Sequence, residues 1–323
     1  MSLPMQPSVP GSSIAVRVTA MRLEAPDVMS LELRAEAGHA LPEAEPGTHV
    51  DLHLPNDVIR PYSVVANEEG AYLLGVKRES QSRGGSAYVH DHMRVGDSLR
   101  LTQPRQKFPL ADQANHSVLI AGGIGITPLL PMARALHSSG RSWQLHYAGR
   151  DIASFPFARV LQGMGEGVHF YASRSASGGR RPDLRTLVDN APPDSHFYCC
   201  GPPGMLEDFK LATRDLDPSR VHTERFHAVV PEPDAGGFEL HLSRSGRRIK
   251  VHPNQTALDA LLAEGVDVDY SCRQGVCGSC EARVLQGTPE HQDEVLTEAE
   301  RASNRSIILC CSRSREPLLV LDL

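Results

Sequence analysis

The sequence predicts a multidomain fold: an antiparallel β-barrel, then an α/β domain with a parallel sheet, then a small α+β unit. Three observations support this order. Short alternating strands recur over the first third of the chain, strands then alternate with helices, and a loop of closely spaced cysteines follows near the C-terminus. At 323 residues the chain is long enough for two or three domains of ordinary size.

The first domain is expected to be the barrel, because strands that are both short and frequent are typical of small antiparallel barrels. The expected strands are IAVRV, VMSLEL, HVDLHL, YSVV, AYLLGV and SLRLT, all between Ile14 and about Leu110. One helix is expected to interrupt them, with Ser86 as its N-cap and its end near Met93.

From His116 to Phe226 strands alternate with helices, which predicts a βαβ series around a parallel sheet. The expected strands are SVLIAG, WQLHYA, VHFYA, HFYCC and VHTERF, and the expected helices run from Thr127 to Leu136, near Phe157 to Leu161, and after Pro202 to about Thr213. The apolar stretch 118–136 has the length of a membrane span, but its glycines and prolines fit strand–turn–helix better.

A short linker of turn-forming residues at 230–237 is expected to lead into the last unit. The strands FELHL, RRIKV, EARVL, SIILC and LLVLDL, with a helix from Thr256 to Ala263, predict a small α+β fold there. The expected domains are therefore 13–112 for the barrel, 113–229 for the α/β domain and 238–323 for the last unit.

The strongest chemical signal is the spacing of Cys272, Cys277, Cys280 and Cys310, which reads C-x4-C-x2-C…C. This spacing holds a plant-type 2Fe–2S cluster. Zinc usually takes two-residue spacings at both ends of its site, and only one such pair exists here, so zinc and plain buried thiols are the weaker alternatives. In a strand, Cys310 and the adjacent Cys311 would face opposite ways, so only one can bind the cluster. We choose Cys310.

A second signal is the glycine-rich turn GGIGITP, residues 122–128, between an apolar strand and a helix. Gly122, Gly123 and Gly125 would let a pyrophosphate approach the helix N-terminus, although the full dinucleotide fingerprint is absent and a tight turn that binds nothing is the alternative. Cys200 ends another parallel strand, where ligands of such sheets bind, and could lie beside a nicotinamide ring. A small core residue is the other interpretation of Cys200.

The barrel carries a third signal in Arg60-Pro61-Tyr62-Ser63, followed by SRGGS at the start of the expected helix. An aromatic ring and a hydroxyl beside a cation suit a flat heteroaromatic ring that carries a phosphate. Free N–H groups at the helix start would bind that phosphate, with Arg60 or Arg83 neutralising its charge. A strand edge and a surface loop are the alternative interpretations.

Taken in this order, the motifs resemble the phthalate dioxygenase reductase family, the single-chain reductases of Rieske-type oxygenases. The resemblance covers about Ser13 to Leu323 and is carried by RPYS, GVKRE, SRGGS, GGIGITP, CGPPGM, CRQGVCGSCE and CSRSREPLLVLDL. It implies an FMN-binding barrel, an NAD(P)-binding α/β domain and a plant-type ferredoxin domain with the β-grasp fold. It also favours Cys310 as the fourth cluster ligand.

The resemblance implies roles for matching positions. Arg60, Tyr62 and Ser63 would hold the isoalloxazine, with Val76 and Lys77 alongside, and Arg83, Gly84, Gly85 and Ser86 would bind the FMN phosphate. Thr127 would approach both flavin and nicotinamide, and Phe226 would cover the flavin ring. One departure concerns the coenzyme: Ser173 and Arg174 occupy the place where NADH-preferring relatives often carry an acidic residue. The family favours NADH, whereas this pair suits the 2′-phosphate of NADPH.

The resulting hypothesis is a reductase that passes electrons from NAD(P)H through FMN and a 2Fe–2S cluster to a Rieske-type oxygenase. The alternatives are a reductase for a cytochrome P450 and an iron–sulfur redox sensor without turnover. The net charge of −6 gives no indication of nucleic-acid binding, and seven cysteines suit a reducing compartment. Because no signal peptide is recognisable, we expect a soluble, cytoplasmic protein with no membrane partner.

Overall fold

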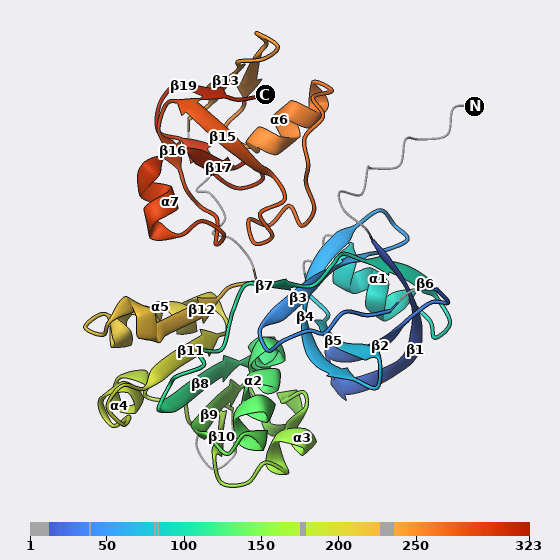
Figure 1. Cartoon of the computed structure of the whole chain (residues 1–323), viewed down its shortest axis with the longest axis vertical. Helices are drawn as coiled ribbons and strands as arrows, with labels where there is room; N and C mark the ends of the chain where they lie inside the picture. The colour runs from blue at the N-terminus through green and yellow to red at the C-terminus, as the bar shows by residue number, and fades with distance from the viewer. Residues whose placement is uncertain (1–12, 39, 81, 83, 175–178, 227–235) are drawn as a thin grey trace. The chain divides into compact units, whose positions relative to one another are not determined.

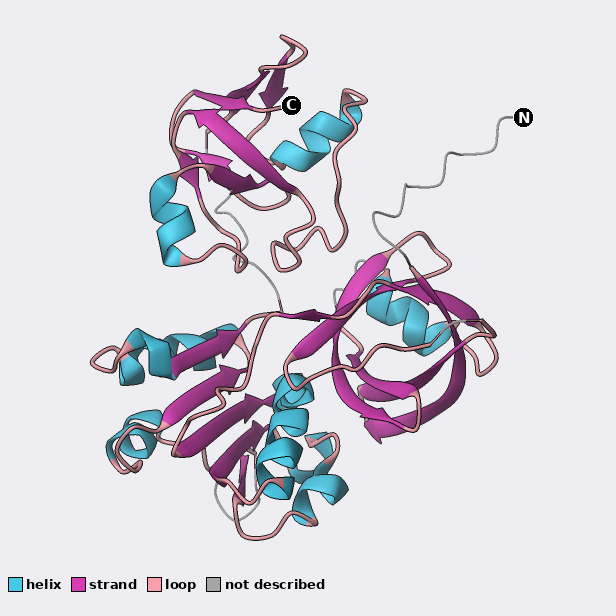
Figure 2. Ribbon diagram, in the orientation of Figure 1, coloured by secondary structure: helices cyan, strands magenta, loops and turns pink. Residues whose placement is uncertain are grey.

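The computed structural model describes residues 13–38, 40–80, 82, 84–174, 179–226 and 236–323 (Figures 1 and 2). The chain divides into two compact units, Met1–Glu224 and Arg225–Leu323. The first unit contains an antiparallel barrel and a parallel sheet, and the second is the α+β unit with the cysteine loop. The expected fold class is confirmed, while the domain boundaries near residues 112 and 237 stay predictions.

Six antiparallel strands form the barrel, because β4 pairs with both β5 and β3 and thereby joins the two ends of the sheet. The barrel strands are β1 (Ile14–Ala25), β2 (Val28–Ala35), β3 (Thr48–His53), β4 (Ile59–Glu68), β5 (Ala71–Lys77) and β6 (Ser98–Leu101), and the short β7 (Arg105–Gln106) pairs with β3. Apolar side chains that alternate along these strands fill the barrel, among them Val16, Leu31 and Leu52. This alternation is the pattern from which the strands were predicted.

The expected N-cap of the barrel helix is wrong. Helix α1 runs from Gly85 to Asp91, and Gly84 occupies the N-cap position with φ 90°. A left-handed conformation at this point requires glycine, so backbone geometry decides where the helix begins. The Ser86 hydroxyl lies in the first turn, where it donates to Ser82 Oγ and accepts from the Glu79 N–H.

The parallel sheet has the strand order β10-β9-β8-β11-β12. Its strands are β8 (His116–Gly122), β9 (Ser142–Gly149), β10 (Val168–Ala172), β11 (His196–Cys200) and β12 (Val221–Glu224), and its helices are α2 (Ile126–Ser138), α3 (Ala158–Gln162), α4 (Leu184–Asp189) and α5 (Pro203–Thr213). From β8 the chain builds outward through β9 to β10, and it then returns to the other side of β8 to build β11 and β12. The topological switch point therefore lies between the neighbouring strands β8 and β11. Ligands of open α/β sheets bind at such a point, outside the carboxyl ends of the strands.

The second unit is a mixed sheet with two helices and an irregular cysteine loop. It comprises β13 (Phe238–Leu242), β14 (Arg248–Val251), α6 (Ala257–Ala263), β15 (Glu281–Gln286), β16 (Pro289–Glu290), α7 (Glu298–Ser303), β17 (Ser306–Ile308), β18 (Arg313–Ser314) and β19 (Leu318–Leu321). Strand β17 ends at Ile308, so Cys310 and Cys311 lie in a turn. The expectation that both belong to one strand is wrong. Among the described residues, no helix is long and apolar enough to cross a lipid bilayer.

Candidate electron-transfer sites

The glycine-rich turn lies at the switch point of the parallel sheet. Strand β8 ends at Gly122, a 3₁₀ turn covers Gly123–Gly125, and α2 follows. A Cβ atom on Gly125 would lie 2.1 Å from the carbonyl oxygen of Cys200, so the turn packs backbone to backbone against the end of β11. Two of the sequence-predicted nucleotide motifs, GGIGITP and CGPPGM, are therefore neighbours at the edge where such sheets bind ligands.

Thr127 lies where this turn meets the barrel. A Cβ atom on Gly75 of β5 would be 2.7 Å from Thr127 Cγ2, which places the side chain directly against the barrel strand. The Thr127 hydroxyl donates to the Ile124 carbonyl at 2.9 Å, which fixes its rotamer. The side chain of Val76 is fully buried in the barrel core, and Lys77 pairs with Glu79 at 3.6 Å. The predicted flavin strand and the predicted nucleotide turn thus adjoin at Thr127.

The Arg60-Pro61-Tyr62-Ser63 segment lies on β4, next to β3. Tyr62 packs against the barrel core, and burial raises the pKa of its hydroxyl above the ordinary value. Ser63 is buried, and its Oγ has no hydrogen-bond partner among the described residues. A buried polar atom without a partner is costly in a finished fold, so a bound group that supplies hydrogen bonds would fit here.

His49 is the cross-strand partner of Ser63 and was not anticipated from the sequence. Its Nε2 also has no partner among the described residues, and burial lowers the pKa of His49 to about 4. The neighbouring Asp51 is fully buried and pairs with Arg105 at 2.6 Å. The buried polar side chains of His49, Asp51 and Ser63 therefore lie on the outer face of β3 and β4. Only the strand pairing brings these residues together, so no sequence motif predicted this polar cluster.

The start of α1 is close to a cation. A Cβ atom on Gly85 would lie 2.7 Å from Arg60 Cγ, so the Arg60 side chain crosses the first turn of the helix. Gly84 and Gly85 add no side chains of their own to this turn, and the N-cap position at Gly84 has no side-chain cap. An anion at the start of α1 would thus meet backbone N–H groups of the first turn and the Arg60 guanidinium. Arg83, the other predicted cation, lies outside the described residues.

Cys200 has an acidic neighbour that the sequence analysis missed. It is 1% exposed and pairs across the sheet with Glu224, at the carboxyl ends of β11 and β12. The Glu224 Oε2 atom is buried without a partner among the described residues, and burial raises the pKa of Glu224 to about 8. Burial, together with Glu224, raises the pKa of the Cys200 thiol well above its ordinary value. At neutral pH this site therefore presents a protonated carboxyl and a neutral thiol.

Ser173 and Arg174 follow β10 at the same carboxyl edge. The Arg174 N–H donates to the Arg150 carbonyl at 2.6 Å, and the Arg180 N–H donates to the Ala172 carbonyl at 2.9 Å. These backbone contacts gather three exposed arginines, two strands away from the glycine-rich turn. Phe226 is half-buried and follows β12 as part of the second compact unit, and its place over a flavin stays a prediction.

Backbone N–H groups point at three of the four sulfurs in the cysteine loop. Gly275 N donates to Cys310 Sγ at 3.2 Å, and Gln274 N donates to Cys272 Sγ at 3.3 Å. Cys272 N donates to Cys277 Sγ at 3.5 Å. Such N–H···S bonds stabilise thiolates and tune the reduction potential of a bound cluster. All four cysteines are buried, as the ligands of a protected redox centre must be.

The thiols form one connected network, in which Cys272 neighbours Cys277 and Cys310, and Cys310 also neighbours Cys280. The hydrogen bond from the Cys272 thiol lowers the pKa of Cys277 to about 6. Hydrogen bonds from Cys272, Cys280 and Cys311 likewise hold the pKa of Cys310 far below its usual range. The Cys311 sulfur has Cys310 as a thiol neighbour but neither Cys272 nor Cys280, and it also contacts the Ile308 carbonyl and Ser312 Oγ among the described residues. Cys310 is therefore better placed than Cys311 to be the fourth ligand.

Four neighbouring thiols can supply the two thiolates that a 2Fe–2S cluster needs at each iron. Within the described part of the chain, no group of three or more His, Cys, Asp or Glu side chains is arranged to hold a single metal ion. The donor set thus fits a 2Fe–2S cluster.

Comparisons with known proteins agree with this chemistry. Residues 240–315 match the family described as the 2Fe-2S iron-sulfur cluster binding domain. The subunit beta of phenoxybenzoate dioxygenase from Ectopseudomonas oleovorans is 46% identical over 312 residues, which cover 96% of this chain and 97% of that protein. The solved structure of phthalate dioxygenase reductase aligns with a TM-score of 0.75 and 33% identity, and covers 96% of this chain and 98% of its own. The chain belongs to the phthalate dioxygenase reductase family.

A further solved structure places the same architecture inside a larger enzyme. An intact type IV self-sufficient cytochrome P450 monooxygenase aligns with a TM-score of 0.82 and 34% identity, over 96% of this chain but 41% of that protein. The present reductase is an oxidoreductase that binds a flavin, a pyridine nucleotide and a 2Fe–2S cluster, and it transfers electrons through them. Its partner is an oxygenase.

Proposed function

We propose that this protein is the reductase component of a Rieske-type oxygenase and takes its electrons from NADH through FMN. The observation that carries the proposal is the group of four buried thiols in the same chain as the flavin barrel. A reductase that acts on small acceptors directly needs no such unit. The bound cofactors supply hydride acceptance and single-electron release, and the protein supplies orientation, electrostatics and exclusion of water.

In the proposed flavin site, Tyr62 and Ser63 hold the isoalloxazine, and Ser63 Oγ gains the hydrogen bond that it otherwise lacks. Arg60, Gly84, Gly85 and Ser86 bind the phosphate at the start of α1, where Arg60 balances its charge. FMN rather than FAD is proposed because the family uses FMN. Arg83 is retained in this proposal on the SRGGS motif alone.

In the proposed nicotinamide site, Thr127 belongs to the glycine-rich turn, Cys200 packs against that turn through its backbone, and Glu224 lies beside Cys200. The protonated Glu224 carboxyl can both donate and accept a hydrogen bond, as can the carboxamide of a nicotinamide. The neutral Cys200 thiol adds no charge that would oppose binding. Gly122, Gly123 and Gly125 leave room for the pyrophosphate at the N-terminus of α2.

The Glu224 carboxyl makes stability depend on pH. It keeps its proton to about pH 8 in the folded protein, whereas the unfolded chain releases it near the ordinary value of 4.5. Between these values the folded state binds more protons, so the free energy of unfolding falls as pH rises. From about pH 5 to about pH 8, wild type should lose up to about 4 kcal/mol relative to Glu224→Gln.

This prediction is checked by urea unfolding of wild type and Glu224→Gln at both ends of that pH range, followed by flavin fluorescence. Glu69→Gln is the control, because it makes the same chemical change at a side chain that is 90% exposed. Parallel stability curves for wild type and Glu224→Gln would show that Glu224 titrates normally and would remove it from the proposed site.

The coenzyme is tested by anaerobic titration of the holoprotein with NADH and then with NADPH, followed by visible absorption. NADH is expected to bleach the flavin and cluster bands. NADPH should act within about tenfold of the same concentration, because Arg174 and its neighbouring arginines can pair with a 2′-phosphate. Equal or better reduction by NADPH would overturn the assignment of NADH. Flavin bleaching without cluster bleaching would contradict the electron path.

A cytochrome P450 is the second candidate partner, since a self-sufficient P450 contains a region similar to nearly the whole of this chain. The two acceptors can be distinguished by mixing the reduced protein anaerobically with a purified Rieske oxygenase or with a P450 under carbon monoxide. The proposed function requires faster reduction of the Rieske centre. Reduction of the P450 alone would replace the Rieske partner with a haem enzyme.

A further inference from the structure

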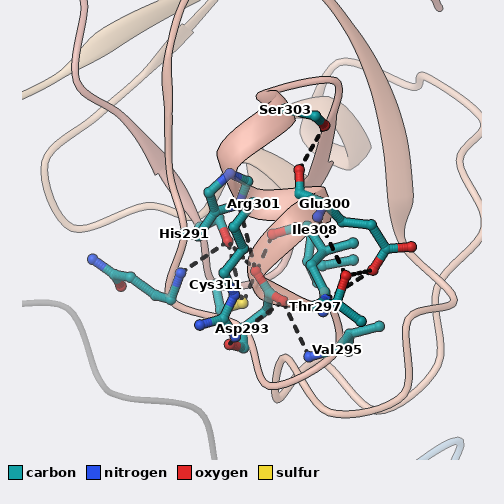
Figure 3. A network of polar contacts seen from close by, with 12 residues as sticks. His291, Asp293, Val295, Thr297, Glu300, Arg301, Ser303, Ile308 and Cys311 are labelled. Atoms are coloured by element: carbon teal, nitrogen blue, oxygen red, sulfur yellow. Dashed lines mark hydrogen bonds and ion pairs between the residues drawn. The ribbon is translucent and has the colours of Figure 1, made fainter. Parts of the chain in front are cut away.

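A buried carboxylate in the second unit lies in a segment that contacts the cysteine loop. Asp293 is 1% exposed, in the segment between β16 and α7 (Figure 3). Its Oδ2 accepts hydrogen bonds from the N–H groups of Val295 at 3.1 Å and Leu296 at 2.8 Å. These two bonds fold the chain around the carboxylate, so residues 292–296, called the Asp293 segment below, form a tight turn.

The Asp293 segment is tied to the chain that carries the fourth cysteine. Asp293 Oδ1 accepts a hydrogen bond from Ser312 Oγ at 3.3 Å, and the same hydroxyl accepts from the Gln292 N–H at 3.2 Å. Ser312 is buried and lies two residues after Cys310. Because Cys310 lies in a turn and not in a strand, sheet pairing does not fix its position. Backbone hydrogen bonds of Leu309 with Cys280 and Leu258 hold one side of this turn, and the hydrogen bonds of Ser312 hold the other side.

The Asp293 segment also holds the loop of the other three cysteines. The Glu294 N–H donates to the Gly275 carbonyl at 2.9 Å, and the Gly275 N–H in turn donates to Cys310 Sγ at 3.2 Å. Val295 packs on the same loop, since a Cβ atom on Gly278 would lie 3.0 Å from Val295 Cγ1. One short segment therefore contacts both parts of the chain that contribute thiols.

Arg301 of α7 balances the buried charge. Its guanidinium lies 3.7 Å from Asp293 Oδ2 and also donates to the Asp293 carbonyl oxygen. His291 Nδ1 lies 3.7 Å from Oδ1, but burial lowers the pKa of His291, so it is neutral at pH 7. The Asp293 carboxylate is thus hydrogen-bonded and paired with the Arg301 guanidinium, and both contacts offset the free-energy cost of burying its charge.

We propose that Asp293 is a positioning residue for the 2Fe–2S site and that its carboxylate holds the Cys310 turn and the three-cysteine loop in the geometry that retains the cluster. The inference rests on the proposed role of the four cysteines. It assigns a cluster function to a residue that touches no sulfur ligand directly. Outer groups that orient metal ligands typically change metal retention by about 10–100-fold when removed.

The test compares Asp293→Ala with Glu300→Ala in the full-length holoprotein. Glu300 is the matched control: it accepts from Thr297 N and Thr297 Oγ1 in the capping box of α7, so its loss weakens the same helix without releasing the Asp293 segment. The rate at which an iron chelator bleaches the cluster band is measured for each. Asp293→Ala should bleach at least about tenfold faster than wild type, and Glu300→Ala within about twofold.

Two further variants and one spectrum separate positioning from simple destabilisation. Asp293→Asn keeps the shape and most hydrogen bonds and should retain the cluster nearly as wild type does. Ser312→Ala removes only the link behind Cys310 and should bleach at an intermediate rate, and it remains informative if Asp293→Ala does not fold. The electron paramagnetic resonance g values of the reduced cluster should shift in Asp293→Ala and Ser312→Ala but not in Glu300→Ala.

Equal bleaching rates for Asp293→Ala and Glu300→Ala, or unchanged g values in Asp293→Ala, would overturn the proposal and leave Asp293 as a stabiliser of α7. Wild-type protein that lacks cluster bands would overturn the proposed function as well. The two failures are therefore distinguishable.

Discussion

Replacing Cys277 with serine should lower reduction of cytochrome c by at least about 100-fold while flavin reduction by NADH stays within about twofold of wild type. Cys277 is one of the four thiols expected to bind the cluster, so its loss leaves one iron with a single thiolate. Apart from Phe226, the residues predicted to bind flavin and nucleotide lie in the first compact unit, which does not contain Cys277. Stopped-flow absorption measures the flavin step, and steady-state cytochrome c reduction measures the step beyond the cluster.

Cys311→Ser is the matched control because it replaces sulfur by oxygen in the buried cysteine next to Cys310. Among the described residues its sulfur neighbours the Cys310 thiol and no other cluster thiol, so the cluster and turnover should survive. Cys310→Ser should instead behave like Cys277→Ser. Cluster loss in Cys311→Ser with retention in Cys310→Ser would reverse the choice of fourth ligand. Loss of flavin reduction in Cys277→Ser with the flavin still bound would contradict the sequential route.

The cluster site could be predicted well from sequence because the spacing of three cysteines in one loop is itself a geometric constraint. Strand alternation was used to argue that only one of Cys310 and Cys311 can bind the cluster, and that premise is wrong because β17 ends at Ile308. In the structure the selection comes from contacts with the distant Gly275 and Cys272, which no local pattern encodes. The resemblance and the geometry agree on Cys310, which stays a prediction until it is tested.

Residues that depend on tertiary burial were missed. Glu224 is an ordinary acidic residue in the sequence, and only its burial at the end of β12, beside Cys200, raises its pKa to about 8. Asp293 likewise looks like one of several surface acids until Ser312 folds over it. By contrast, α7 could have been predicted, because Thr297 and Glu300 have the spacing of a capping box. Local sequence signals predict where a helix or strand begins. The protonation and contacts of a site residue depend instead on which distant segments pack against it in the fold.

Gly125→Ala is expected to lower the rate of flavin reduction by NADH at least about 100-fold, because displacement of a reacting group by about 1 Å can cost that much. The new Cβ would lie 2.1 Å from the Cys200 carbonyl oxygen, far inside contact distance. Since both atoms that clash are fixed to the backbone, no side-chain rotation relieves the overlap. The turn and the end of β11 must separate, and the proposed nicotinamide site between Thr127 and Cys200 widens with them.

Gly140→Ala is the control for a general loss of stability. Gly140 has φ 67° and open space around its Cα, so alanine there costs about 1 kcal/mol of backbone strain without touching the turn. Both variants should lower the melting temperature, but only Gly125→Ala should slow the anaerobic flavin reduction measured by stopped flow. Flavin reduction by dithionite should be unchanged in both, because that reaction needs no bound nucleotide. If Gly125→Ala reduces its flavin with NADH as fast as Gly140→Ala does, the close contact between the two loops does not hold the nicotinamide, and the hydride must enter elsewhere.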